Sequence, residues 1–61
     1  MHIFSFESQA EVMYDEVRYT RIRYSEQRVQ WFVGVGVHAR EVAPHVQAEL
    51  EAEFQKLLSA L

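Results

Sequence analysis

The sequence predicts a small α+β domain in which a β-hairpin is covered on one face by a C-terminal amphipathic helix. Residues 28–37 alternate in hydrophobicity with a period of two, and residues 17–24 form a second β-rich run just before them. The apolar residues of 43–61 repeat with the period of a helix. We expect a single domain, because a chain of 61 residues has room for only one core.

The hairpin is predicted from its β-branched and aromatic residues and from the short polar segment 25–27 between its strands. If Glu26 and Gln27 are the two turn residues, Ile22 faces Trp31 on the core side. The other core pairs are then Tyr24 with Val29, Thr20 with Val33 and Arg18 with Val35. The outer pairs are Arg23 with Gln30, Arg21 with Phe32, Tyr19 with Gly34 and Val17 with Gly36. A shift of one residue would move one strand's side chains to the opposite face.

The helix over about 43–61 is predicted from a narrow apolar stripe. At 100° per residue its large apolar side chains fall within an arc of ~80°. These side chains are Val46, Leu50, Phe54, Leu57 and Leu61. Pro44 suits the first helical turn and disfavours helical geometry at the preceding residue, which places the start near 43–44.

The N-terminal quarter is predicted as a short strand followed by a short helix. Residues 3–6 are a strand candidate, and Ser8 with Glu11 has the capping-box spacing that precedes a helix over about 9–16. The expected order is therefore β-α-β-β-α. The alternative is a three-stranded meander plus helix, β-β-β-α, with one long strand over 12–24. Asp15 and Glu16 argue against that strand, because acidic residues are depleted in strands.

Charge is divided along the chain. The net charge is -3, but residues 1–16 sum to -4, residues 17–40 to +4 and residues 41–61 to -3. One expectation is that these blocks pair with each other in the fold. The chain contains no cysteine, signal-peptide pattern or long apolar run, so we expect no membrane association and a reducing, cytoplasmic location.

No residue pattern predicts catalysis, a cofactor or a metal. The chain has no cysteine nucleophile, and none of its serines lies in a nucleophile-elbow context. His38, Glu41 and His45 have helical spacing, but Pro44 interrupts the helix that would bring them together. Two histidines and one carboxylate also fall short of a structural zinc site. We therefore expect a non-enzymatic protein.

Two surfaces are candidates for partner binding. The outer hairpin face combines arginine with aromatic residues, which is typical of interface hot spots. Its expected contact residues are Tyr19, Arg21, Arg23, Gln30 and Phe32. The second surface is an acidic row on the helix, formed by Glu49, Glu51 and Glu53, which could imitate a phosphate backbone. Because so small a core yields little stability, the chain could also form a homodimer.

Nucleic-acid binding by the arginine-rich hairpin is the alternative function. In architecture the predicted fold is similar to small domains that bind DNA through three strands backed by one helix. The net charge of -3 and the acidic flanking segments oppose this function, since phosphate neutralisation dominates such binding.

In size and acidity the chain resembles the small inhibitors that phages use against host machinery, including anti-CRISPR proteins. The resemblance implies a regulator or inhibitor of a larger protein complex.

Overall fold

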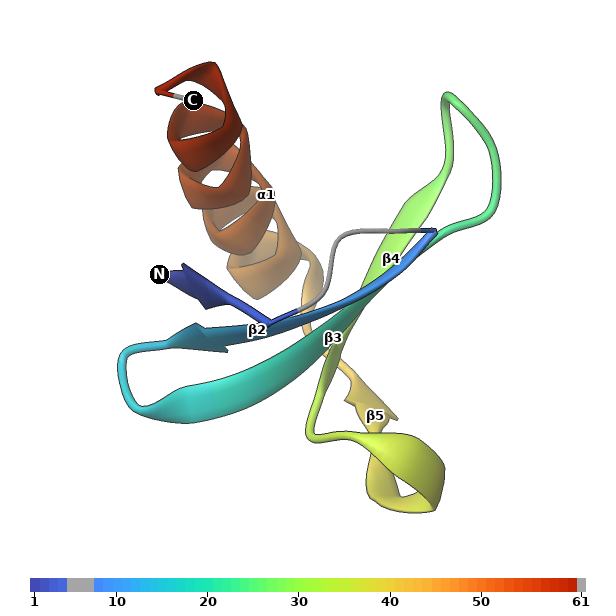
Figure 1. Cartoon of the computed structure of the whole chain (residues 1–61). Coiled ribbons are helices and arrows are strands. Elements are labelled where there is room, and N and C mark those ends of the chain that lie inside the picture. Colours follow the sequence, from blue (N-terminus) through green and yellow to red (C-terminus); the bar gives the residue numbers. More distant parts are fainter. Residues whose placement is uncertain (5–7, 61) are drawn as a thin grey trace.

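The computed structural model describes residues 1–4 and 8–60, which form a five-stranded antiparallel sheet and one C-terminal helix (Figure 1). The strands follow one another across the sheet in chain order. The elements are β1 (His2–Ile3), β2 (Gln9–Tyr14), β3 (Val17–Arg23), β4 (Val29–Val33), the 3₁₀ turn η1 (Gly36–His38), β5 (Arg40–Glu41) and α1 (Pro44–Ser59). The predicted α+β class is confirmed, as is the C-terminal helix. Residues 5 and 6 of the predicted first strand, and Leu61 of the predicted helix, lie outside the described residues.

The helix predicted over 9–16 is wrong, because these residues form β2 and the turn that follows it. Ala10 and Val12 are buried on the same side of β2, the period expected of a strand. Asp15 and Glu16 have φ angles of 53° and 64°, so they are the two central residues of a tight turn with positive φ at both positions. Such turns match the twist of the flanking strands. The acidic pair therefore ends a strand, and the order is closer to the β-β-β-α alternative.

The register of β3 and β4 is shifted by one residue from the predicted register. Arg21 pairs with Trp31, and Ile22 pairs with Gln30. Ser25 belongs to the turn, because the Tyr24 amide donates to the Arg28 carbonyl at 2.9 Å and leaves residues 25–27 as the connection. The connection is therefore one residue longer than the predicted two-residue turn.

The strand predicted over 28–37 is also too long, because β4 ends at Val33. Gly34 and Gly36 have φ angles of +91° and +67°, which turn the chain out of the sheet into η1. The chain then returns as β5 and pairs with the end of β4. In Figure 1, η1 projects away from α1.

The core lies between one sheet face and α1. Among the described residues, the buried apolar side chains are Ala10, Val12, Trp31, Leu50 and Phe54. The Trp31 and Phe54 rings pack edge to face, with centroids 5.6 Å apart. The predicted covering of the Trp31 side by the helix is confirmed. No helix in the described ranges 1–4 and 8–60 has the length and apolar character needed to cross a membrane.

Candidate protein-binding surface

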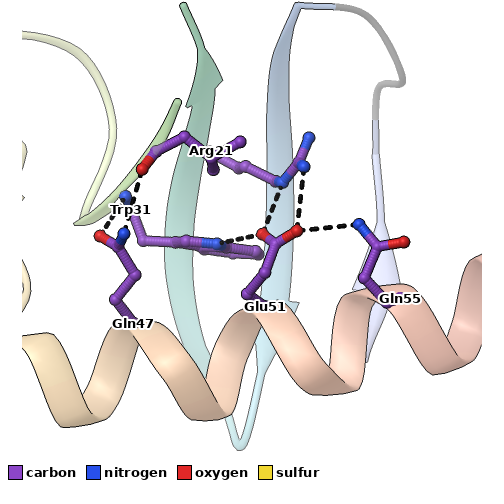
Figure 2. A network of polar contacts seen from close by, with 6 residues as sticks. Arg21, Trp31, Gln47, Glu51 and Gln55 are labelled. Atoms are coloured by element: carbon purple, nitrogen blue, oxygen red, sulfur yellow. Dashed lines mark hydrogen bonds and ion pairs between the residues drawn. The ribbon is translucent and has the colours of Figure 1, made fainter. Parts of the chain in front are cut away.

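A polar network under α1 takes Arg21 and Glu51 out of the predicted binding surfaces (Figure 2). The Arg21 side chain donates from Nε to Glu51 Oε1 at 2.9 Å and from an Nη atom to Oε2 at 3.1 Å. The guanidinium also lies 4.5 Å from the centre of the Phe54 ring. Arg21 is only 8% exposed. One basic residue of the central block thus pairs with one acidic residue of the C-terminal block, as the charge pattern suggested.

The same carboxylate accepts two further hydrogen bonds. Trp31 Nε1 donates to Glu51 Oε1 at 2.8 Å, and Gln55 Nε2 donates to Oε2 at 2.8 Å. Partial burial would by itself raise the pKa of Glu51, but the hydrogen bonds from Arg21, Gln55 and Trp31 outweigh it and lower the pKa from 4.5 to about 2. Glu51 is therefore ionised throughout the neutral range, and it holds α1 to the sheet.

Gln47 attaches α1 to the edge of β4. Its Oε1 accepts a hydrogen bond from the Trp31 amide at 3.1 Å, and its Nε2 donates to the Val29 carbonyl at 3.0 Å (Figure 2). The amide thus pairs with main-chain groups that a neighbouring strand would otherwise use. Because Val42 donates to the Trp31 carbonyl as well, this part of the edge is occupied from within the chain.

The predicted hairpin surface does not exist as one face. The shifted register places Tyr19, Arg21 and Arg23 on the α1 side of the sheet, whereas Gln30 and Phe32 lie on the opposite side. Tyr19 is half-buried, with its ring 6.4 Å from Trp31, and Arg23 is exposed. The prediction that these five residues share a face is therefore wrong. A partner contact by any of them remains a prediction.

The predicted acidic row on α1 is also divided. Glu51 points to the sheet, Glu49 is exposed, and Glu53 lies 3.4 Å from Lys56 Nζ. Desolvation and, after it, the negative charges of Glu53 and Glu49 raise the pKa of Tyr14. Three carboxylates in an exposed row are not available for phosphate mimicry.

Within residues 1–4 and 8–60, no helix lies over the sheet face opposite α1, and we call this face the open face. Residues reach it by strand alternation from β1–β4 and their flanking positions. Its members include His2, Phe4, Gln9, Glu11, Met13, Arg18, Thr20, Ile22, Tyr24, Arg28, Gln30, Phe32 and, from β5, Glu41. The sequence interpretation placed Gln30 and Phe32 correctly but assigned Arg18, Thr20, Ile22 and Tyr24 to the core side.

Two arginines of the open face are stacked on aromatic rings. The Arg18 guanidinium lies 4.6 Å from the centre of the Phe4 ring, and that of Arg28 lies 5.1 Å from the Tyr24 ring. The ion pairs of residues 1–4 and 8–60 are Arg21–Glu51 and Lys56–Glu53. Within that part of the chain, Arg18 and Arg28 therefore have no carboxylate partner.

A hollow of about 200 Å³ lies on the open face beside the η1 turn. It is lined by Gln9, Thr20, Ile22, Phe32, Gly36 and Ala39. Thr20 Oγ1 donates to the Gly34 carbonyl at 2.8 Å, and the Gly34 amide donates to the Arg18 carbonyl at 2.7 Å. These bonds hold the start of the segment that leads to Gly36 against β3, whose Thr20 also lines the hollow. Sequence reasoning missed this site because it extended β4 through both glycines.

The candidate metal residues are not assembled. Over the described ranges, no three histidine, aspartate or glutamate side chains are grouped closely enough to hold a metal ion. His38 ends η1, Glu41 lies in β5 and His45 lies in the first turn of α1. The open face combines a hollow with two arginines stacked on aromatic rings. The chain matches no protein-family model, no curated protein and no solved structure.

Proposed function

We propose that this chain is a non-enzymatic protein-binding module that regulates or inhibits a larger protein complex through its open face. The observation that carries the proposal is the exposure of aromatic side chains beside arginines that have no carboxylate partner in the described residues. Phe4 is 45% exposed and Tyr24 is 55% exposed. Aromatic residues and arginine are enriched in protein interfaces and in their hot spots.

The exposed surface also supports binding. The accessible area is 4546 Å², compared with about 4,100 Å² for a monomeric protein of 7.2 kDa. At the apex of η1, Val37 is 95% exposed, although main-chain bonds hold the turn on both sides. An apolar side chain presented on a well-anchored turn gains most by burial in a partner.

The finer features of the proposal rest on sequence properties. Small size and acidity favour an inhibitor of the kind that phages make, including anti-CRISPR proteins. The absence of cysteine favours action in the cytoplasm. A homodimer formed through the open face would be a different outcome, because it would bury the surface that we assign to a partner.

Single-stranded nucleic acid is the second candidate, since aromatic rings and arginines on a sheet face can stack bases. The net charge of -3 and the exposed Glu41, which pairs with Phe32 at the sheet edge, disfavour a nucleic acid, because its phosphates recur at every nucleotide and would lie against this carboxylate as well as against the arginines. We therefore favour a protein.

Photo-crosslinking from two adjacent positions tests the proposal. A benzoylphenylalanine at Tyr24 would report on the open face, and the same group at Arg23 would report on the α1 side. In cells that produce the chain, we expect position 24 to crosslink to one protein and position 23 to give little of that product. Crosslinks from position 23 alone, to nucleic acid, or to a second copy alone would contradict the proposal.

A further inference from the structure

We infer that the hollow receives one apolar side chain of an acidic partner segment, and that Arg18 and Arg28 bind carboxylates on either side of it. The inference rests on the proposed function, because it names the chemistry of the partner that the open face would bind. It requires three features: a hollow of the right size, two available cations, and a suitable spacing between them.

The size of the hollow suits a single side chain. Its volume of about 200 Å³ lies below the about 300–1,000 Å³ of typical small-molecule pockets. Ile22 and Phe32 supply apolar walls, while Gly36 leaves one wall without a side chain. A Cβ built on Gly36 would meet no atom within 4 Å, so this side of the hollow is open. An aliphatic or aromatic side chain can therefore enter from the open face.

The two arginines are already positioned for anions. Each guanidinium is held against a ring, Arg18 on Phe4 and Arg28 on Tyr24, and so loses less freedom on binding than an unrestrained side chain. Both residues are exposed, and within the described residues neither forms an ion pair. A planar guanidinium matches a carboxylate through two parallel hydrogen bonds.

The spacing places the hollow between the cations. Main-chain hydrogen bonds join Gly34 to Arg18 and Tyr24 to Arg28, so the arginines lie at opposite ends of the β3–β4 ladder. Residue 18 in β3 and residue 24 directly after it are separated by about 20 Å at ~3.3 Å per residue. Thr20 and Ile22 line the hollow between them. An extended partner segment with acidic residues about three positions before and after an apolar residue spans this distance.

A peptide titration followed by amide NMR shifts tests the inference. The probe is a synthetic peptide with a central leucine, a glutamate three residues away on each side, and serine elsewhere. We expect shifts concentrated at Gln9, Ile22, Gly36 and Ala39. Arg18→Gln and Arg28→Gln should each weaken binding about threefold. Arg23→Gln, which removes an exposed arginine from the opposite face, should leave binding unchanged.

Filling the hollow gives a second test. Ala39→Leu should weaken peptide binding by at least about tenfold. A thermal melting curve verifies that the variant is folded. The wild-type titration keeps the inference falsifiable if this variant does not fold.

Three results would overturn the inference: no binding, equal binding of a lysine-flanked peptide, or tighter binding of a ten-residue oligothymidylate. If position 24 still crosslinks to a protein while the acidic peptide does not bind, the proposed function stands and only this partner chemistry fails.

Discussion

Replacing Glu51 with glutamine tests whether the carboxylate holds α1 to the sheet. The substitution preserves size but leaves the buried Arg21 guanidinium without its counter-ion. The lowering of the Glu51 pKa from 4.5 to about 2 corresponds to at most about 3.4 kcal/mol at about 1.36 kcal/mol per unit. Because the side chain is 31% exposed, solvent screening reduces the expected loss to about 2 kcal/mol.

A loss of that size is large for this chain. A domain of 61 residues has a free energy of unfolding of about 3–9 kcal/mol. We therefore expect the midpoint of thermal unfolding to fall by roughly 10 °C. Urea unfolding at pH 7, followed by the fluorescence of Trp31, measures the free-energy difference without adding salt that screens the ion pair.

Glu49→Gln is the matched control, because Glu49 is exposed on the same helix and its replacement should change stability by less than about 0.5 kcal/mol. The reasoning is refuted if Glu51→Gln is no more destabilising than Glu49→Gln. The network would then contribute specificity of helix docking without net stability.

Three further predictions concern pH, a turn and the sheet edge. Because the pKa of Glu51 is lowered on folding, its contribution to the free energy of unfolding should be complete above about pH 4.5 and disappear as the pH falls through about 2. Urea titrations at several pH values should show that the free energy of unfolding of Glu51→Gln depends less on pH than that of the wild type. Glu16→Gly should stabilise the domain by about 0.5–1 kcal/mol, because Glu16 has a φ of 64°; Glu26→Gly in the other turn should not raise the melting temperature, and equal gains would contradict this origin. Gln47→Leu should lower the free energy of unfolding by about 1–3 kcal/mol, because the Trp31 amide and the Val29 carbonyl lose this partner. Sedimentation should also reveal concentration-dependent association, because the freed main-chain groups of β4 can pair with a second copy. A monomer at all concentrations would show that Gln47 does not prevent such pairing.

The helix and the hairpin could be predicted because each depends on local periodicity. Leu50 and Phe54 recur at helical spacing, and both are buried against the sheet. Val29, Trp31 and Val33 recur with a period of two in β4, and Trp31 becomes the centre of the core. Such patterns are preserved in the fold because burial of one face dominates the free energy of a small domain.

The residues of the binding surface could not be predicted, because they depend on the length of the turn between β3 and β4. Ser25 extends the connection between β3 and β4, and the resulting shift places Arg21 beside Glu51 on the α1 side. Arg18 moves to the open face by the same shift. Periodicity does not distinguish these registers, since both preserve alternation along each strand.

The N-terminal error has a different origin. Ser8 and Glu11 satisfy a local helix-start pattern, but the Ser8 carbonyl accepts a hydrogen bond from the Arg23 amide at 2.8 Å. Long-range pairing therefore outweighs the local preference. The Asp15–Glu16 turn also lacks the glycine that usually identifies a positive-φ turn in a sequence.

The two hydrogen bonds of Gln47 attach α1 to β4 without using any side chain of that strand. The Gln47 amide contacts only main-chain atoms of Val29 and Trp31, which every amino acid except proline supplies. Phe32 points to the other side of the sheet and takes no part in those two contacts, whereas the Gln30 side chain donates to the Trp31 carbonyl at 3.0 Å. The Phe32 side chain can therefore be exchanged during evolution or by design to select a new target while the helix stays docked.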